Sequence, residues 1–245
     1  IIRKTEAPNH TCNGSNSRKR KNSQILIDIL SHIVEFRNGE SGQHVQHIKM
    51  LTGFLLDRLM QKTDKYDLKW SDQYMITIAS ALHDIGKVGI DEKILNKPGR
   101  LTNEEFEEMK KHTLIGASML KSLGVYQDEE LVKVAYQICR WHHERYDGKG
   151  YPDGLKGEEI PIAAQVVSVA DVYDALTSER VYKKAFSHEK AMEMILAGEC
   201  GTFNPLLLEC LQDIQGNIQV EMKRAAEQPM LVQNSYVGKM IETVQ

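Results

Sequence analysis

Apolar residues recur every three to four positions along most of the chain, which is the period of an amphipathic helix. The pattern starts with SQILIDILSHIVEF at Ser23 and resumes, beyond RNGESG, in HVQHIKMLTGFLLDRLM. Apolar and polar residues do not alternate over a series of segments, as they would in half-buried strands. The pattern therefore predicts an all-α bundle of roughly eight or more helices.

Capping residues mark where several of these helices are expected to begin. Ser71 is predicted to cap the segment DQYMITIASALHDI, and Thr102 with Glu105 forms the capping box of the long helix that follows. The other predicted starts are at Pro161, at Ser187 and at the pair Asn204 and Pro205. Between these helices, RYDGKGYPDGLKGEEIP is too rich in glycine and proline for a regular helix and is predicted to be a loop.

The pattern divides the chain into three parts. Residues 1–22 are polar, contain the basic run SRKRK and lack a helical period, so they are predicted to be a leader or linker. Residues 23–214 form the predicted helical domain, and residues 215–245 form a C-terminal helical extension of the same domain. Because the chain begins with Ile1, we expect it to be part of a longer protein.

Composition narrows the class of protein. The 245 residues carry a formal net charge of −3 and a sequence pI near 6.3, which gives no general attraction to DNA, RNA or an anionic membrane. The four cysteines form no CxxC pair, and no signal peptide or apolar run of membrane length occurs. We therefore expect a cytoplasmic protein without a membrane segment.

Histidines and carboxylates gather at the ends of the predicted helices and on their apolar faces. A single histidine beside an apolar face is usually structural, and His10, His32, His47 and His188 are interpreted in that way. The other five histidines and three acidic residues form the candidate group Glu40, His44, His83, Asp84, His112, His142, His143 and Asp171. Imidazole and carboxylate ligands without thiolate suit iron, manganese, nickel or zinc, and a carboxylate can bridge two ions. The group therefore predicts a centre with more than one metal ion.

Three longer motifs point to a family. HDIGK, HHERYDGKGYPDGLKGEEIP and VADVYDALTSERVYKKA resemble the motifs of the HD-GYP family, the HD-domain phosphohydrolases that hydrolyse cyclic di-GMP and related cyclic dinucleotides. The resemblance extends from Ser23 to about Ile214. It implies an HD-domain helical bundle with a GYP loop, in a bacterial enzyme of second-messenger signalling.

The resemblance also implies a ligand set. The metal ligands would be His44, His83, Asp84, His112, His142, His143 and Asp171, with Asp84 as the bridging carboxylate. Glu40 matches the glutamate that holds a third ion in some members, and its alternative interpretation is a solvated carboxylate stabilised by a helix dipole. The expected cofactors are therefore two or three divalent transition metal ions, with iron as the first choice and manganese as the alternative.

Other residues match the family's substrate contacts. Lys87, Arg180 and Lys183 are expected to contact phosphate, and Tyr151 of the Gly-Tyr-Pro loop is expected to wall the nucleotide pocket. Whether Tyr151 packs against a base or a neighbouring side chain stays open. Asp174, one turn beyond a predicted ligand, is expected to orient a ligand or the bound water. The residues assigned to catalysis are Asp84, Lys87 and Asp174.

The expected reaction follows from the charge of a phosphodiester. A hydroxide that bridges the ions held through Asp84 would attack phosphorus in line with the departing ribose O3′. The product would be pGpG, with GMP after a second cut. Two alternatives stay open: hydrolysis of another cyclic dinucleotide such as cyclic GMP-AMP, and a catalytically inactive nucleotide-binding signalling module.

Two positions depart from the family's pattern. Asn204 stands where aspartate is usual, and both residues cap helices well. His47 stands where arginine is common, three residues after the first predicted histidine ligand, and is either inert or alters a salt bridge near the site. Members of the family are commonly attached to receiver or other sensory domains, so such a domain and a second copy of the chain are the expected protein partners.

Overall fold

The computed structural model describes residues 12–38, 43–179 and 184–227. Within these ranges the chain forms nine α-helices and four short 3₁₀ helices, and no β-strand. One isolated β-bridge joins Asp147 to Lys156 in the long loop. The predicted all-α fold is confirmed.

The helices follow one another along the chain with short connections. The α-helices are α1 (Cys12–Arg37), α2 (Gln43–Lys62), α3 (Trp70–Ala79), α4 (Glu92–Leu95), α5 (Asn103–Lys121), α6 (Glu130–Trp141), α7 (Ile162–Thr177), α8 (His188–Leu196) and α9 (Pro205–Glu227). The 3₁₀ helices are η1 (Ser80–Leu82), η2 (Ile85–Gly89), η3 (Gly124–Tyr126) and η4 (Gly157–Glu159). Among the described helices, none has the length and hydropathy that a membrane-spanning segment requires.

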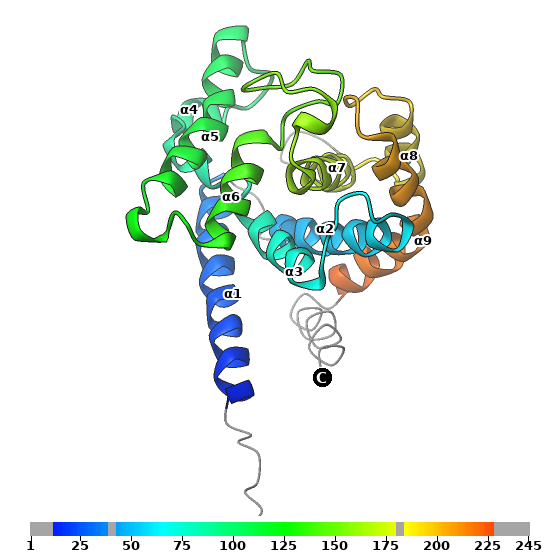
Figure 1. Cartoon of the computed structure of the whole chain (residues 1–245). Helices are drawn as coiled ribbons and strands as arrows, with labels where there is room; N and C mark the ends of the chain where they lie inside the picture. Colours follow the sequence, from blue (N-terminus) through cyan, green and yellow to red (C-terminus); the bar gives the residue numbers. More distant parts are fainter. Residues whose placement is uncertain (1–11, 39–42, 180–183, 228–245) are drawn as a thin grey trace, which may run out of the picture.

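α7 is the central helix of the bundle. Its sequence is apolar on almost every side, and all residues from Ala163 to Ala170 are buried. A helix that is apolar all round is stable only inside a protein. It contacts α2, α6 and α8, and Figure 1 shows it end-on among them. This packing brings Asp171 and Asp174, on the second half of α7, toward α2.

Most of the predicted helix starts are confirmed. The Thr102 hydroxyl accepts from the backbone N–H of Glu105, and the Glu105 side chain accepts from the backbone N–H of Thr102, which is the predicted capping box. Ser187 caps α8, and the side-chain oxygen of Asn204 caps α9. Pro161 takes the N-cap position of α7, directly before the first helical residue.

The predicted cap at Ser71 is wrong. α3 begins at Trp70, and Lys69 occupies the N-cap position. The side chain of Asp72 accepts from the backbone N–H of Lys69 (2.8 Å), so a carboxylate on the third helical residue satisfies the start of the helix. Ser71 lies inside the first turn, and its hydroxyl donates to Asp72 Oδ1 (3.3 Å) instead.

α1 is longer than the apolar pattern predicts. It begins at Cys12, inside the segment interpreted as a polar leader or linker, rather than at Ser23. Arginine and lysine are good helix formers, and a helix nucleated by a packed segment extends at one hydrogen bond per added residue. The predicted boundary between residues 214 and 215 likewise falls inside α9, which runs unbroken to Glu227. The first difference lies at a helix end, where propagation rather than the apolar pattern decides the length. The second lies in the middle of α9, where buried Ile214 and Ile218 continue the apolar side across the predicted boundary.

A close approach joins η2 to α5. A Cβ atom at Gly86 would overlap the backbone carbonyl of His112 and crowd the backbone N–H of Gly116. Glycine is the residue that fits here, so η2 lies directly on α5. This contact holds the segment HDIGK beside His112.

Gly86→Ala should lower the free energy of unfolding by about 1–3 kcal/mol, because the added methyl group meets backbone atoms that cannot rotate away. Gly216→Ala is the matched control. A Cβ atom there meets nothing within 4 Å, and alanine inside α9 should raise the stability by about 0.5–1 kcal/mol. Urea denaturation measures both changes, and equal effects of the two substitutions would contradict the close approach.

Candidate metal centre

The segment that contains His83 and Asp84 leaves the end of α3. α3 stops at Ala79, the chain tightens into η1, and His83 follows with only 1% of its surface exposed. The Nδ1–H of His83 donates to the carbonyl of Ser80 (2.9 Å), which fixes the ring and leaves Nε2 as an acceptor. The buried helix end therefore presents a ring nitrogen that can bind a metal ion.

Two further histidines are oriented in the same way. His112 on α5 donates from Nδ1 to the carbonyl of Met109 (2.7 Å), and His142, directly after α6, donates from Nδ1 to the carbonyl of Ile138 (2.9 Å). Both rings are buried. A histidine that ligates a metal almost always donates its other ring N–H to such a partner. Three rings from three separate elements thus present Nε2 as an acceptor.

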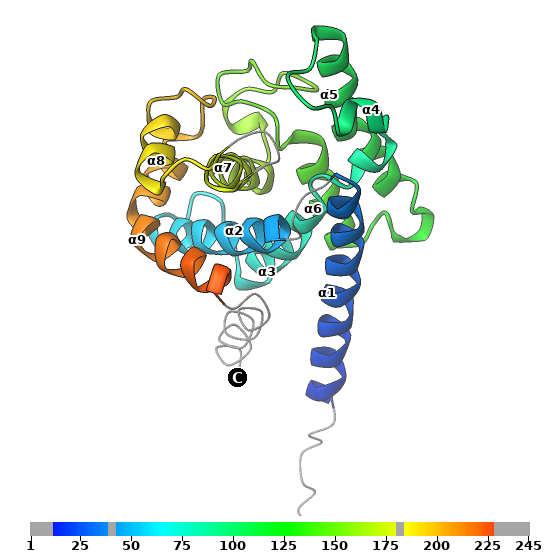
Figure 2. The same ribbon diagram turned by 180° about the vertical axis from the view of Figure 1, so that it is seen from behind.

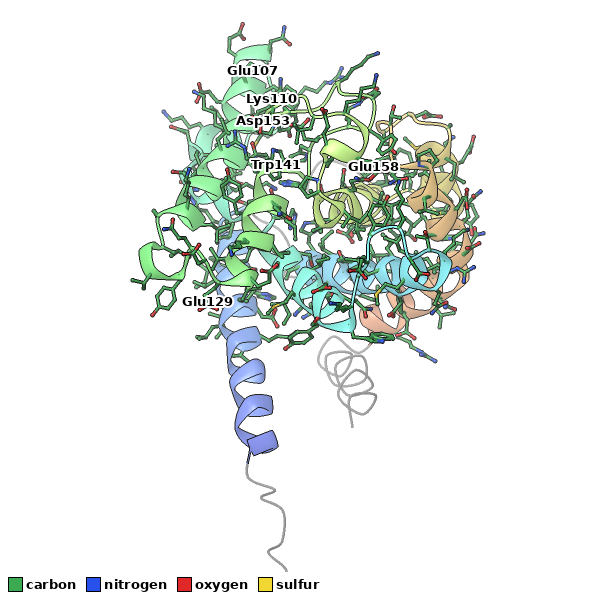
Figure 3. All side chains as sticks on the ribbon, viewed as in Figure 1. Glu107, Lys110, Glu129, Trp141, Asp153 and Glu158 are labelled. Atoms are coloured by element: carbon green, nitrogen blue, oxygen red, sulfur yellow. The ribbon has the colours of Figure 1, made fainter. Side chains whose placement is uncertain are left out.

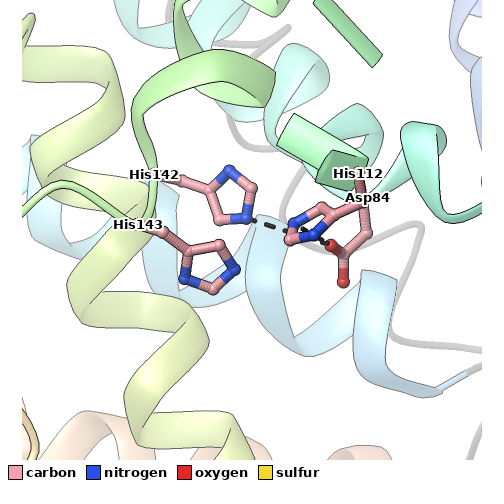
Figure 4. Close-up of side chains that lie close together, drawn as sticks. All are labelled: Asp84, His112, His142 and His143. Carbon is pink, nitrogen blue, oxygen red and sulfur yellow. Dashed lines mark ion pairs between the residues drawn. The ribbon is translucent and has the colours of Figure 1, made fainter. Parts of the chain in front are cut away.

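The first group of potential ligands comprises Asp84, His112, His142 and His143 (Figure 4). Each residue can offer one atom such that the four atoms lie within 4.8 Å of one another. Asp84 Oδ1 lies 3.3 Å from His112 Nε2 and 3.9 Å from His142 Nε2. The ring centroids of His142 and His143 lie 4.0 Å apart. Imidazoles with one carboxylate form a donor set that a divalent transition metal ion accepts.

The second group comprises His44, His83 and Asp84, so Asp84 belongs to both groups. His83 Nε2 lies 3.3 Å from His44 Nε2 and 3.3 Å from Asp84 Oδ2. Asp171 Oδ1 is 3.8 Å from His44 Nε2 and 3.9 Å from His83 Nε2. A carboxylate shared by two groups is suited to bridging two ions, the role predicted for Asp84.

The donor atoms fit a metal centre because their acceptor lone pairs converge. Asp84 Oδ1, His112 Nε2 and His142 Nε2 are buried and have no hydrogen-bond partner among the described residues. An unpaired buried acceptor costs about 1–3 kcal/mol. His44 Nε2 and His83 Nε2 also face each other at 3.3 Å, and the Nδ1 atoms of both rings are already hydrogen-bonded. Burial would lower the pKa of His83, but the adjacent Asp84 carboxylate outweighs it and raises that pKa, so a bound cation would replace a proton at this position. Cations bound between these converging atoms would satisfy their lone pairs.

The electrostatics of the first group keep its members in the forms that bind metal. Burial lowers the pKa of His142 to about 3, and it lowers the pKa values of His112 and His143 as well. Burial would raise the pKa of Asp84, but the ammonium of Lys87 and the neighbouring rings outweigh it and hold that pKa well below its usual range. The group thus combines neutral imidazoles with an ionised carboxylate, which are the protonation states that metal ligands need.

Asp174 holds the ring of His44 from behind. It is fully buried on α7, and its Oδ2 accepts from His44 Nδ1 (2.7 Å). Its Oδ1 accepts from His47 Nδ1 (2.7 Å) and from the hydroxyl of Ser178 (2.8 Å). Burial would raise the pKa of Asp174, but the hydrogen bonds from His44 and His47 outweigh it and lower the pKa. His47 is therefore not inert: it shares the carboxylate that holds a predicted ligand.

Arg37 is a residue near the site that the sequence pattern does not reveal. Its guanidinium donates to the carbonyls of Lys87 (2.7 Å), Val88 (2.7 Å) and Ile90 (2.8 Å), in and directly after η2. The planar fork of an arginine can bind several such oxygens at once, which the ammonium of a lysine cannot do in a fixed geometry. α1 is therefore joined to the segment that carries Asp84.

Glu35 makes a second link between α1 and the site. Its side chain is buried, and Oε1 accepts from the backbone N–H of Val45 (2.7 Å) at the start of α2, next to His44. Residues of α1 and of the second ligand group also line a cavity of about 10 Å³, which has room for about one water molecule. The sequence signal for this role is a single acidic residue within the apolar stretch HIVEF.

The GYP loop lies against the first ligand group. The ring of Tyr151 stacks on the ring of His143, with centroids 4.8 Å apart and planes inclined by 26°, and Phe106 meets Tyr151 edge-on. Lys110 Nζ lies over both aromatic rings, 5.0 Å from the centroid of Phe106 and 5.5 Å from that of Tyr151. Burial raises the pKa of Tyr151, so its hydroxyl stays protonated. The ring of Tyr151 thus packs against His143 and Phe106, and its predicted role beside a base stays a prediction.

Two carboxylates fix the base of this loop. Glu144 Oε1 accepts from the backbone N–H groups of Asp153 (2.7 Å) and Gly154 (3.0 Å). The side chain of Asp153 in turn accepts from the guanidinium of Arg140 and from the indole N–H of Trp141 (2.7 Å), and Figure 3 shows Trp141 and Asp153 near each other. The loop is thus fixed to the end of α6, beside the first ligand group.

The structure brings six of the predicted ligands together in the two groups, and Asp171 lies beside the second. Lys87 Nζ lies 2.6 Å from Asp84 Oδ2, so a predicted phosphate contact faces the shared carboxylate. The other predicted site residues, Glu40, Arg180 and Lys183, lie outside the described residues.

Known proteins similar to this chain share its helical domain. The family model described as HD domain matches residues 24–203. A probable cyclic di-GMP phosphodiesterase of Vibrio cholerae is 41% identical over 212 residues, which cover 84% of this chain and 48% of the relative. The 3′3′-cGAMP-specific phosphodiesterase 2 of the same organism is 38% identical, over 78% of this chain and 35% of the relative. The chain thus spans about half or less of the length of these two relatives.

A solved structure has a similar fold. The crystal structure of a cyclic GMP-AMP specific phosphodiesterase of Vibrio cholerae matches with a TM-score of 0.58 at 18% identity. The match covers 89% of this chain and 53% of that one. At this level of identity the likeness shows the fold alone.

The lowered pKa of His142 predicts how the metal-free protein responds to acid. Below about pH 6.5 the unfolded chain binds a proton on this ring and the folded chain does not, so the free energy of unfolding falls as the pH falls. The contribution is at most about 1.4 kcal/mol per pH unit, down to a pH of about 3. His142→Gln removes this titration, so its stability should depend less steeply on pH. Urea denaturation of chelator-treated protein measures both slopes, and equal slopes would contradict a buried neutral ring.

Proposed function

Because the chain belongs to the HD domain family, in its HD-GYP branch, we propose that it is a metal-dependent phosphodiesterase that hydrolyses cyclic di-GMP to pGpG. The observation that carries the proposal is the shared carboxylate, since Asp84 lies in both groups of potential metal ligands. The names of the two relatives, a probable cyclic di-GMP phosphodiesterase and a 3′3′-cGAMP-specific phosphodiesterase, support the substrate class. GMP is the product if the enzyme also cuts the second phosphodiester.

The proposed cofactors are two divalent transition metal ions. One ion would be held by Asp84, His112, His142 and His143, and the other by His44, His83, Asp84 and Asp171. When bound, such ions supply Lewis acidity, which neutralises charge on phosphate oxygens and lowers the pKa of a ligated water. Iron stays the first choice and manganese the alternative. A third ion held through Glu40 stays a prediction, because that residue lies outside the described residues.

Lys87 is proposed to bind the phosphate of the substrate. Its side chain is mostly buried on η2, with Nζ 2.6 Å from Asp84 Oδ2. An ammonium in this position can donate to an anionic phosphate oxygen while it stays within reach of the shared carboxylate. It also offsets part of the repulsion between that carboxylate and the phosphodiester. Arg180 and Lys183 stay predicted phosphate contacts.

Tyr151 is proposed to wall the nucleotide pocket together with Phe106. The ring of Phe106 is 46% exposed beside Tyr151, so it offers apolar surface that a base can cover. Lys110 lies over both rings and places a positive charge at the same wall. An anionic dinucleotide with two flat bases matches this combination of aromatic surface and charge.

Asp174 is proposed to act through His44 rather than on the substrate. Its hydrogen bond to His44 Nδ1 fixes the tautomer and orientation of that ring and raises its basicity as a ligand. His47 and Ser178 fix Asp174 in turn. Asp174 is therefore a positioning residue for the second ligand group.

Cyclic GMP-AMP is the second candidate substrate, because a relative at 38% identity is named as specific for that dinucleotide. The two ligand groups weigh against the other alternative, an inactive nucleotide-binding signalling module. The attached sensory or receiver domain and the cytoplasmic location stay predictions.

Asp84→Asn tests the proposal. The amide keeps the size of the side chain but cannot bridge two cations as a carboxylate does, so turnover of cyclic di-GMP should fall by at least about 100-fold. Turnover is measured by separating cyclic di-GMP from pGpG, on protein purified without oxygen and loaded with iron or manganese, with the metals counted on the same sample. The matched control is Asp213→Asn, whose surface carboxylate pairs with Arg58 and Lys62 and which should keep wild-type turnover.

Near-normal turnover by folded Asp84→Asn protein would overturn the proposed role of the shared carboxylate. A competition between cyclic di-GMP and cyclic GMP-AMP assigns the substrate, and a preference for the latter would favour the second candidate. Metal-loaded wild-type protein that leaves both dinucleotides intact would contradict the assignment as an enzyme of this class.

A further inference from the structure

α1 carries a row of exposed apolar side chains on the side that its own bundle does not cover. This outer face consists of Ile25, Leu26, Ile29, Leu30, Ile33 and Phe36, whose exposed fractions range from 47% to 87%. Single exposed apolar residues are ordinary on any protein, whereas a contiguous apolar patch marks a binding surface. The outer face is such a patch.

The charged residues of the same stretch face inward. Asp28 pairs with Lys49 of α2 (2.7 Å), and Glu35 accepts from a backbone N–H of α2. Ile27 and Val34 are buried on this inner side as well. Between residues 25 and 36, α1 therefore turns both of its charged side chains toward its own bundle and large apolar side chains toward solvent. A helix that is apolar on two sides is normally covered on both.

α1 stands out from the bundle. In Figures 1 and 2 its N-terminal half runs beyond the other described helices. Its main contacts are with α2, η1 and η2, and its C-terminal end is held by the hydrogen bonds of Arg37 to the backbone in and after η2. The outer face lies in the C-terminal half of α1, beside the bundle but on the side that the described residues leave exposed.

The spacing of the outer face is that of a seam between two helices. Four of its residues, Leu26, Ile29, Ile33 and Phe36, follow one another at intervals of three, four and three. In a coiled coil, this spacing puts alternate residues into the two kinds of core position. The other two residues of the outer face flank this seam. Two identical seams are complementary when the helices lie parallel about a two-fold axis.

We propose that the outer face of α1 binds the same face of a second copy of this chain. Covering its six side chains would remove on the order of 600 Å² from each copy, so that the pair exceeds the roughly 1,000 Å² expected of a specific interface. Between residues 25 and 36 the exposed side of α1 carries no Asp, Glu, Lys or Arg, and His32 is its one exposed polar side chain; the basic run SRKRK lies earlier in the same helix. The complement of the outer face is an apolar helix of the same spacing, which a second copy supplies.

The molar mass in solution, measured by light scattering over a dilution series, tests the proposal. The wild-type chain should have twice the mass of one 27.9 kDa chain. The double variant Ile29→Glu, Ile33→Glu places four carboxylates in the paired seam and should have the mass of one chain. The control is Val125→Glu on η3, where a side chain as exposed as that of Phe36 (87%) lies outside the outer face, and it should keep the wild-type mass. Circular dichroism and metal content show that each variant is folded.

A disulfide test identifies the partner and the orientation. In a Cys12→Ser, Cys200→Ser background, Ile29→Cys should give a cross-linked pair of chains under oxidation, because equivalent core positions of a parallel pair lie within disulfide reach. Val125→Cys in the same background is the matched control and should stay uncrosslinked.

A wild-type mass of 27.9 kDa at every concentration would overturn the proposal, as would a double variant that keeps twice that mass. Wild-type protein that stays at the mass of one chain but binds phosphatidylserine vesicles through the outer face would assign that face to a membrane surface instead. These measurements do not depend on turnover, so they test the pairing of α1 independently of the proposed activity.

Discussion

The mostly buried carboxylate of Asp84 is the charge on which the arrangement of the site depends. An isolated ionised carboxylate inside a helical bundle is costly, and burial alone would favour its protonated form. Its pKa is nevertheless held well below the usual range, because Lys87 and the surrounding rings outweigh the burial. The carboxylate can stay ionised only where cations gather around it. The ammonium of Lys87, and the metal ions that the two ligand groups are proposed to hold, meet that condition.

The bundle fixes the orientation of the histidine rings through hydrogen bonds to their Nδ1 atoms, which face away from the metal centre. His83, His112 and His142 each donate from Nδ1 to a carbonyl three or four residues earlier, so local helix geometry fixes them. His44 donates to Asp174 on a different helix, so its orientation depends on the packing of α2 against α7. α1 reaches the site as well, through hydrogen bonds to the backbone around η2. The helix that carries an uncovered apolar face is therefore the one joined directly to the segment HDIGK.

The helices and the residues of the site could be predicted because their signals are local. The helical period, the capping box at Thr102 and the motif HDIGK each occupy one short stretch. The contacts of Arg37 with the backbone around η2, and of His47 with Asp174, join residues 50 to 53 and 127 positions apart, and neither stretch specifies its partner. The cap at Ser71 failed because α3 begins one residue earlier, where the Asp72 carboxylate accepts from the backbone N–H of Lys69. For α1, the period shows apolar sides but not which of them faces the bundle.

Anomalous X-ray diffraction tests most directly whether Asp84 joins two metal ions. Data would be recorded at the iron or manganese absorption edge from crystals of protein whose metal content has been counted. We predict two peaks, one beside His112 and His142 and the other beside His44 and His83, with Asp84 between them. A single peak, in protein that carries two or more ions per chain, would contradict the shared carboxylate.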